Sequence, residues 1–301
     1  MSFLSHVLSP LAAAALTAAL TVAGPATATV GEVSAPQAGF LSSSGPSVVP
    51  GFNSDALAST PATDKTATSP ADGTQKLLKL PRSMPDPVVT RSDSSLAPSL
   101  KDAGQLAPGT AIYNKRTGMR CSTGHIAGKE GHVFVVTAGH CGNTGDTFYY
   151  NSDSGRRVTF GTMRVETENT NVKGFVNSSD IGLIEITNPR AKYNSSPNLD
   201  GELAGWISND EVERTRPTIC RLGSTTGFSC GNYLGINREV GGFYFANHAA
   251  KGDSGGAVYA LVDGKYYAVG VYSAYIEEVD SMHLAMEVGT TLNQHGLSLY
   301  N

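Results

Sequence analysis

The sequence predicts an all-β protein of antiparallel strands, arranged as a barrel or a sandwich. Short runs of β-branched, aromatic and other apolar residues follow one another from Gly109 onward, with Gly, Asn and Asp between them. The chain contains 34 Gly and 12 Tyr, and both residue types favour a strand-rich protein with many turns over a helical one. Between two of the runs, Val262-Asp263-Gly264-Lys265 is a strong hairpin signal.

The expected strands, in chain order, are Thr110–Tyr113, His132–Thr137, Thr147–Tyr150, Arg157–Val165, Ile181–Ile186, Thr218–Leu222, Tyr244–Asn247, Ala257–Val262 and Tyr266–Ser273. The polar stretch Asn194–Gly201 separates the earlier runs from the later ones, and it marks the expected boundary between two halves. One helix is expected, at Glu287–Gln294. Gly296 is its expected C-cap, because Gly readily adopts the left-handed conformation that ends a helix.

The N-terminus contains a candidate export signal. Val7–Val22 is almost wholly apolar and rich in Ala, and Ala26-Thr27-Ala28 follows as a small-x-small cleavage pattern. This arrangement is typical of a signal peptide, so we expect removal of residues 1–28 and a secreted, extracellular protein. The alternative is an uncleaved membrane anchor. The run is shorter than the ~20 residues of a spanning helix and Pro10 interrupts it, so we expect no stable membrane association after cleavage.

The following segment, residues 29–108, is predicted to be a low-complexity pro-region or linker. From Gly31 to Pro108 it is rich in Ser, Pro, Ala, Thr and Asp and has no Tyr, Trp or Cys. Such a composition buries little apolar surface, so we expect most of it to be disordered. The patch Lys76–Arg82 could be a helical turn, a docking segment or a cleavage site. A propeptide removed on maturation, as in a zymogen, and a plain linker both fit this segment.

Charge and cysteine content narrow the class of protein. The net charge of −4 and the 16% of charged residues leave no basic surplus, so we expect no nucleic-acid partner. Four cysteines in an exported chain indicate two disulfides, for which three pairings are possible. We favour Cys121–Cys141 and Cys220–Cys230, because each closes a short loop. A zinc site is the disfavoured alternative, since the spacings contain no Cys-x-x-Cys element; we expect no metal and no cofactor.

The stretch Ala250–Gly256 places a serine hydroxyl, that of Ser254, between glycines. Glycines allow a tight turn that aims successive backbone N–H groups at one point. A nucleophile beside preorganised N–H donors is what acyl transfer requires. Because a serine alone is a weak nucleophile at neutral pH, this interpretation needs a base and an acid that orients it.

Two residues upstream fit these roles. His140, in Thr137-Ala138-Gly139-His140-Cys141, lies on the turn after an apolar strand, and imidazole can accept a serine proton and later return it. Asp180 lies just before the apolar run Ile181–Ile186, where a buried carboxylate needs a hydrogen-bond donor such as an imidazole N–H. A surface-turn histidine and a strand-initiating aspartate are the simpler alternatives.

These three motifs, in the order His, Asp, Ser, resemble the chymotrypsin-like serine proteases; subtilisins and α/β-hydrolases use other orders. Residues 109–301 resemble, more specifically, the bacterial branch that includes streptogrisins and α-lytic protease. The stretches that carry this closer resemblance are Ala111–Tyr113, Arg120–Ser122, Cys220–Gly231, Val288–Leu292 and Gly296–Tyr300.

The resemblance implies two antiparallel six-stranded Greek-key β-barrels with the site between them. The first barrel would span about 109–195 and the second about 203–301. Ser254 would be the nucleophile, His140 the general base and acid, and Asp180 the residue that orients His140. The backbone N–H groups of Gly252 and Ser254 would form the oxyanion hole. Ser273 would support Asp180 and begin the substrate-binding edge, which would also include Ala274.

Some positions depart from the family pattern. His248 stands where many relatives have a disulfide cysteine, Lys251 where the branch often has Pro, and Tyr275 where it has a small Gly at the pocket entrance. We therefore include His248 and Tyr275 among the substrate-binding residues, with the hypothesis that they narrow the pocket or favour an acidic side chain. The alternative is that His248 bonds to backbone and has no part in specificity.

The sequence thus predicts a secreted bacterial serine endopeptidase that acts as a monomer on polypeptide substrates. One alternative is a non-catalytic binding protein or toxin on the same scaffold, although such proteins usually lack a triad member and none is missing here. Another is an esterase-like hydrolase that uses the same three residues.

Overall fold

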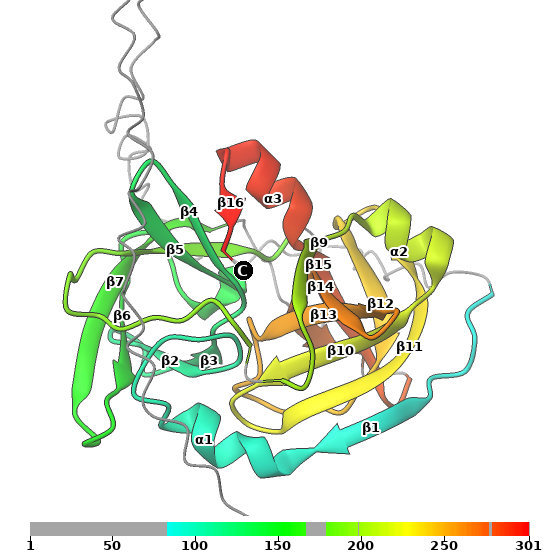
Figure 1. The fold of residues 1–301 in the computed structure, drawn as a ribbon, viewed down its shortest axis with the longest axis horizontal. Helices are drawn as coiled ribbons and strands as arrows, with labels where there is room; N and C mark the ends of the chain where they lie inside the picture. The colour runs from blue at the N-terminus through cyan, green and yellow to red at the C-terminus, as the bar shows by residue number, and fades with distance from the viewer. Residues whose placement is uncertain (1–82, 167–178, 198, 277–278, 301) are drawn as a thin grey trace, which may run out of the picture. The chain divides into compact units, whose positions relative to one another are not determined.

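The computed structural model of the chain describes residues 83–166, 179–197, 199–276 and 279–300. Within these ranges the chain forms two β-sheets and few helices (Figure 1). The all-β class with a short C-terminal helix is therefore confirmed. The expected signal peptide and the patch Lys76–Arg82 lie outside the described residues.

The first sheet has the strand order β16-β4-β5-β8-β7-β6-β2-β3, and all its pairs are antiparallel. Its strands are β2 (Ala111–Asn114), β3 (Arg120–Ser122), β4 (Ile126–Lys129), β5 (His132–Thr137), β6 (Thr147–Asn151), β7 (Arg157–Glu166), β8 (Gly182–Ile186) and β16 (Ser298–Leu299). Residues around the β3–β4 connection bond to the second sheet: the Ser122 N–H donates to the Ser254 carbonyl (2.7 Å), and the His125 ring lies 2.9 Å from the Gly270 carbonyl. Among the described residues, the end strands β16 and β3 do not pair with each other, so this sheet does not close on itself and forms a half-barrel.

The second sheet closes on itself. Its order is β11-β10-β13-β14-β15-β12, and β12 also pairs with β11, which completes a six-stranded barrel. The strands are β10 (Thr218–Gly223), β11 (Gly227–Asn237), β12 (Gly242–Ala246), β13 (Ala257–Val262), β14 (Lys265–Tyr275) and β15 (Met282–Glu287). Two further strands join from outside: β9 (Leu203–Trp206) runs parallel to β14, and β1 (Val89–Asp93) runs antiparallel to β11.

The helices are short. They are α1 (Ala97–Lys101), α2 (Asn209–Thr215), α3 (Val288–His295) and the 3-10 turns η2 (Ser94–Leu96) and η3 (Gly139–Cys141). The C-terminal helix α3 and its cap at Gly296, with φ +62°, are confirmed. The expectation of a single helix is wrong. Ser208 caps α2 by accepting the Glu211 N–H (3.3 Å), but this helix has only Val212 as an apolar residue, so no apolar periodicity reveals it.

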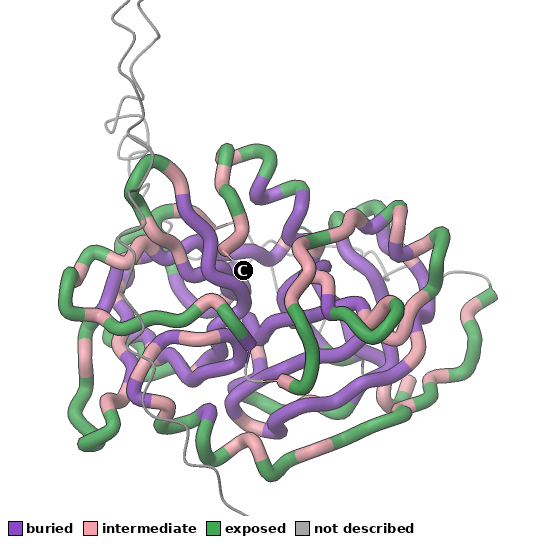
Figure 2. Tube along the Cα trace, viewed as in Figure 1, coloured by how far each residue is buried: buried purple, intermediate pink, exposed green. Residues whose placement is uncertain are grey.

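The buried residues follow the strands of both barrels (Figure 2). The core of the half-barrel includes Ile112, Phe148, Phe160 and Ile184. One core cluster of the closed barrel includes Tyr233, Phe243, Phe245 and Val258. A third cluster joins the two barrels, because it combines Val136 and Ile181 of the first with Val271 and Leu284 of the second. Apolar burial between the barrels therefore stabilises the arrangement that brings their facing residues together.

The folded region begins earlier than the sequence indicates. Residues 83–108, expected to belong to a mostly disordered segment, contain β1, η2 and α1, and β1 extends the barrel along β11 (Figure 1). The pairing depends on backbone hydrogen bonds to the free edge of β11, which side-chain composition does not reveal.

Several strands were not expected, namely β1, β3, β4, β9, β11 and β15. In contrast, β16 lies within Gly296–Tyr300, which the family resemblance implies to be the last strand. Among the unexpected strands β11 is the longest, and Gly227, Gly231 and Gly235 interrupt its apolar pattern. Glycine weakens a strand signal but allows close approach of another backbone: a Cβ on Gly231 would overlap with the Ala246 carbonyl. The β12 strand begins at Gly242, two residues before the expected run (244 − 242 = 2).

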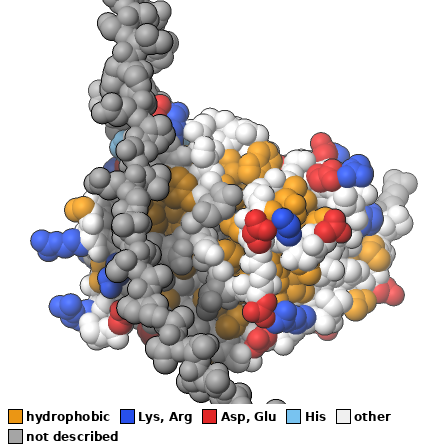
Figure 3. All heavy atoms as spheres, viewed as in Figure 1, with side chains coloured by type: hydrophobic (Ala, Val, Ile, Leu, Met, Phe, Trp, Pro, Cys, Tyr) orange, Lys and Arg blue, Asp and Glu red, His pale blue; other side chains and the backbone are white. Residues whose placement is uncertain are grey.

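On the face drawn in Figure 3, Lys and Arg side chains are interspersed with Asp and Glu, and no single-sign patch dominates that face. Within the described ranges, no helix is long and apolar enough to cross a membrane.

Candidate active site

His140 and Asp180 lie together in the half-barrel. His140 is in η3, which follows β5 after one residue, and Asp180 lies two residues before the start of β8, which pairs with β5. The His140 Nδ1 lies 2.8 Å from the Asp180 Oδ2, and the His140 backbone N–H donates to the Asp180 Oδ1 at 2.8 Å. Both carboxylate oxygens thus hold one residue, which fixes the position and the ring orientation of the histidine.

Ser273 on β14 supports Asp180 from the other barrel. Its hydroxyl donates to the Asp180 Oδ2 at 2.5 Å, and the Asp180 side chain is fully buried. Burial alone would raise the pKa of Asp180, but the attraction of the His140 ring and the hydrogen bonds from His140 and Ser273 bring the pKa below its ordinary value. Burial likewise opposes charging of His140, yet the Asp180 charge and hydrogen bond raise the pKa of His140.

The loop before Ser254 presents free backbone N–H groups. Gly252 has φ +100°, a conformation open to glycine and strained for other residues. The N–H groups of Asp253, Gly255 and Gly256 donate to the carbonyls of Ala250, Tyr272 and Asp253. Those of Gly252 and Ser254 have no acceptor within the described part of the chain, so both remain available to a ligand oxygen.

The half-barrel contacts this loop directly. From β3, the Ser122 hydroxyl donates to the Gly252 carbonyl at 2.8 Å and the Ser122 N–H donates to the Ser254 carbonyl. The hydroxyl of Ser224, in the β10–β11 turn of the closed barrel, donates to the same Gly252 carbonyl at 3.2 Å. Cys121, next to Ser122, forms a disulfide with Cys141, next to His140. This expected disulfide therefore ties the histidine turn to the strand end that holds the serine loop.

The Ser254 side chain is partly exposed, and its hydroxyl makes no hydrogen bond within the described residues, to His140 or otherwise. The segments that carry the two residues meet at the junction of the barrels, because the Cys141 Sγ, next to His140, lies 4.0 Å from the Ser254 carbonyl oxygen.

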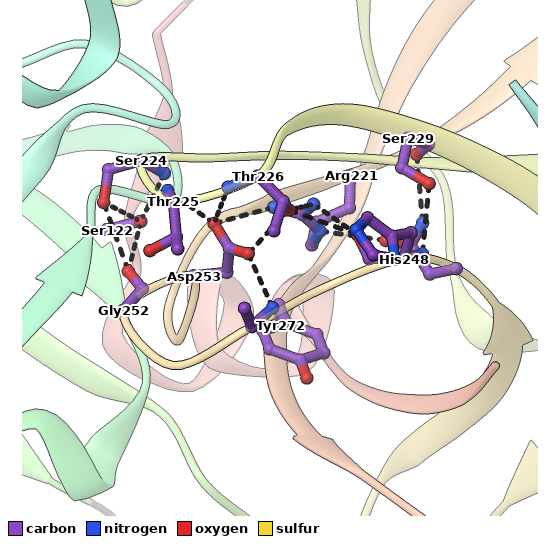
Figure 4. Close-up of polar contacts among 12 residues, drawn as sticks. Ser122, Arg221, Ser224, Thr225, Thr226, Ser229, His248, Gly252, Asp253 and Tyr272 are labelled. Carbon is purple, nitrogen blue, oxygen red and sulfur yellow. Dashed lines mark hydrogen bonds and ion pairs between the residues drawn. The ribbon is translucent and has the colours of Figure 1, made fainter. Parts of the chain in front are cut away.

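Asp253 is the centre of a buried network (Figure 4). Its Oδ1 accepts the Thr225 N–H (2.8 Å) and the Thr226 N–H (3.2 Å), and its Oδ2 accepts the Thr226 hydroxyl (2.7 Å) and the Ala250 N–H (2.9 Å). The Arg221 Nη1 lies 3.2 Å from Oδ1, and both side chains are fully buried. This pair has ionic contact without a directed hydrogen bond, since Nη1 has no hydrogen-bond acceptor.

Sequence reasoning missed Arg221 and the role of Asp253. The available signal was an arginine inside the apolar run Thr218–Leu222, where a charge needs a buried partner. The Arg221 Nη2 also donates to Thr226 Oγ1 (2.5 Å) and to the His248 carbonyl (2.8 Å). The second expected disulfide, Cys220–Cys230, lies beside this arginine and joins β10 to β11.

A cleft of about 370 Å³ contains the expected specificity residues His248 and Tyr275. Both side chains are exposed, whereas Ala274 is buried and Ser273 faces Asp180. The remaining lining residues are Asn247, Ala249, Ile276, Val279, Asp280, Ser281, Met282 and His283. The structure thus brings His248 and Tyr275 to one cleft.

His283 also lines this cleft and was not singled out from the sequence. Burial lowers the pKa of His283 to about 4, so its ring is neutral at neutral pH. Its Nδ1 lies 3.1 Å from the Tyr272 hydroxyl.

One group of potential metal ligands occurs among the described residues: atoms of Cys121, His140 and Cys141 lie within 4.8 Å of one another. Both sulfurs are bonded to each other in the disulfide, so they are not thiolate ligands. Cys121, His140 and Cys141 therefore do not form a metal-binding site.

Comparison with known proteins identifies relatives. No family model matches the chain. Serine protease 2 from Streptomyces fradiae is 33% identical over 172 residues, which cover 52% of this chain and 88% of that protein. Similar solved structures include Thermobifida fusca Protease A (TM-score 0.49, 23% identity, 65% of this chain and 99% of that one). They also include Nocardiopsis Protease (TM-score 0.49, 24% identity, 65% and 100%).

Proposed function

Because the chain belongs to the chymotrypsin-like serine proteases, in the bacterial branch that includes the streptogrisins and α-lytic protease, we propose that it hydrolyses peptide bonds through an acyl-enzyme on Ser254. The observation that carries the proposal is the pair of hydrogen bonds by which Asp180 holds His140, at the junction where Ser254 and two unused N–H groups meet.

In the first half of the reaction, the Ser254 hydroxyl oxygen attacks the scissile carbonyl carbon and its proton passes to the His140 Nε2. The carbonyl oxygen becomes an oxyanion, and the N–H groups of Gly252 and Ser254 donate to it. Asp180 keeps the Nδ1–H of the ring in place and stabilises the imidazolium. Collapse of the intermediate breaks the C–N bond, and His140 gives its proton to the leaving amine.

In the second half, a water molecule loses a proton to His140 and attacks the ester carbon of the acyl-enzyme. The same two N–H groups stabilise the second oxyanion. Its collapse breaks the ester bond, His140 protonates the Ser254 oxygen, and the carboxylic acid product leaves. No cofactor enters any of these steps.

Substrate binds along Ser273, Ala274 and Tyr275 in this proposal, with the side chain before the cleaved bond entering the cleft beside His248. Tyr275 in place of a small residue narrows the cleft, and His248 can donate to an acidic group. Profiling on a peptide library tests this; a preference for large aromatic side chains would contradict it.

Export and maturation are part of the proposal. The apolar run and cleavage pattern in residues 1–28 support secretion from a bacterium, and the two disulfides suit an oxidising compartment. We propose that the protease acts outside the cell as a monomer on polypeptides.

A fluorophosphonate probe tests the assignment, because it reacts with an activated serine. We expect mass spectrometry to find the label on Ser254 and Ser254→Ala to abolish both labelling and peptide cleavage while the circular dichroism spectrum stays unchanged. Unchanged cleavage by Ser254→Ala would refute the proposal. Absence of label in the native protein would favour a binding protein, and cleavage of esters but not peptides would favour an esterase.

A further inference from the structure

The N-terminal strap, which we define as residues 86–100, is bound along the second barrel. Its β1 pairs with β11 from Val89 opposite Gly231 to Asp93 opposite Phe228. Beyond the end of this ladder, the Asn232 side chain continues it: Oδ1 accepts the Val88 N–H (2.7 Å), and Nδ2 donates to the Asp86 carbonyl (3.0 Å). The backbone of the strap is therefore recognised from Asp86 onward.

Side chains anchor the strap as well. Leu100, on α1, is buried in the core cluster that contains Leu222 and Phe228. The Arg91 guanidinium carbon lies 5.1 Å from the centroid of the Phe228 ring, within range of a cation–π interaction. After the strap, Leu106 is fully buried in the core of the half-barrel, and its N–H donates to the Lys192 carbonyl (2.9 Å). This part of the chain is thus fastened to both barrels.

The strap also touches the turn that holds the serine loop. Gly227 follows Thr226 and has φ +74°, and a Cβ on it would overlap with the Asp93 carbonyl oxygen. Thr225 and Thr226 are the residues whose N–H groups donate to Asp253, and Asp253 precedes Ser254. A continuous set of contacts therefore runs from the strap through Gly227 and Thr226 to the nucleophile.

We propose that the N-terminal strap is a positioning element of the working protease, which rests on the function proposed above. It remains attached after any processing of the N-terminal region, and it holds the β10–β11 turn so that Asp253 keeps the serine loop and its two free N–H groups in register. Gly109, the expected start of the protease domain, is then not a processing point.

Reading the N-terminus of the secreted, active protein tests retention. We expect Edman sequencing and intact mass to place the mature N-terminus at or before Asp86, whether processing occurs at the patch Lys76–Arg82, elsewhere upstream or only at the signal peptide. An N-terminus between Val89 and Gly109 in the active protein, with the excised segment absent, would overturn the proposal.

Leu100→Asp tests positioning in the full-length chain, because a buried unpaired carboxylate displaces α1 from the core cluster. Lys101→Asp is the matched control, since it adds the same group at the exposed neighbouring residue of the same helix. Leu100→Met conserves the buried volume, so it should keep hydrogen exchange in β1, kcat and the labelling rate at the wild-type level. Should Leu100→Asp not fold, Leu100→Ala loosens the same anchor more gently.

For Leu100→Asp we expect faster hydrogen exchange in β1 together with an approximately unchanged KM. We expect kcat and the rate of fluorophosphonate labelling at Ser254 to fall about ten-fold, less than the 10²-fold that a misplacement of about 1 Å can cause. A merely structural strap would lower the melting temperature and leave kcat of the folded protein unchanged.

Faster exchange in β1 with wild-type kcat and labelling rate would therefore overturn the positioning role. If the wild-type protein itself fails to label at Ser254, the proposed function fails instead, so the two failures are distinguishable.

Discussion

Asp180 and Asp253 are both fully buried carboxylates, but their partners come from different parts of the molecule. Asp180 accepts hydrogen bonds from His140 in the half-barrel and from Ser273 in the closed barrel. Asp253 is surrounded by groups of the closed barrel alone, namely Arg221, Thr225, Thr226 and Ala250. One carboxylate therefore joins the barrels, whereas the other organises a loop within one of them.

This difference separates two tasks. The closed barrel supplies every group that satisfies Asp253, and the half-barrel adds the two hydrogen bonds from Ser122 to the same loop. Asp180 orients the histidine by two hydrogen bonds within the half-barrel, and docking of the closed barrel adds the support of Ser273 to Asp180 across the junction. Loss of Asp180 should therefore affect the reaction above all, and loss of Asp253 should affect the fold as well.

The largest effect is expected for Asp180→Asn. Asparagine can occupy the same space, but it favours the wrong tautomer of His140, so we expect kcat to fall by about 10⁴-fold. Steady-state kinetics on a peptide substrate measures this. Glu185→Gln, on the strand that follows Asp180 and near the surface, is the control and should retain wild-type kcat. A fall of less than about ten-fold for Asp180→Asn would contradict the orienting role.

Asp253→Ala should lower the free energy of unfolding more than Asp180→Asn does. It leaves Arg221 buried without its partner, and breaking such a pair costs about 3–5 kcal/mol of unfolding free energy. Urea denaturation measures the loss. Asp210→Ala is the matched control, because it removes the aspartate of the exposed pair with Arg238 and should change stability little. Equal losses in both variants would show that burial of the Arg221 pair is unimportant.

The smallest effect is expected in the pH profile of kcat/KM, which tests whether Asp180 sets the pKa of His140. His140 must be neutral to accept a proton, and Asp180 raises the pKa of His140 above its ordinary value, so activity should rise with pH through a midpoint above about 6.5. In Asp180→Asn the attraction is lost while burial remains, so the midpoint should move to lower pH. A profile that is the same in both proteins would show that Asp180 does not set this pKa.

The sequence anticipated the local parts of this architecture well. Strands β5, β13 and the hairpin between β13 and β14 were predicted closely because their apolar runs are continuous and bounded by turn residues. The helix α3 was predicted from its terminal glycine. In contrast, β11 escaped prediction because its glycines, which let β12 approach, interrupt the apolar pattern.

The candidate site likewise contains residues that the sequence predicted and residues that it did not. The motifs around His140, Asp180 and Ser254 were visible because each is a short, chemically distinctive stretch. The support of Asp180 by Ser273 was expected from the family resemblance. Arg221 and Thr226 were not expected as partners of Asp253, since they lie 32 and 27 residues before it (253 − 221 and 253 − 226).

The sequence by itself thus determined the all-β class, the family and the stretches that carry its chemistry, because these depend on residue type and on neighbours along the chain. Only the tertiary structure decided which groups surround Asp253, how Ser122 of the half-barrel bonds to the serine loop, and that β1, before Gly109, pairs with the second barrel from outside. Those contacts join backbone groups and side chains from distant stretches, and hydrogen-bond geometry in the folded state selects them, so composition and spacing do not disclose them.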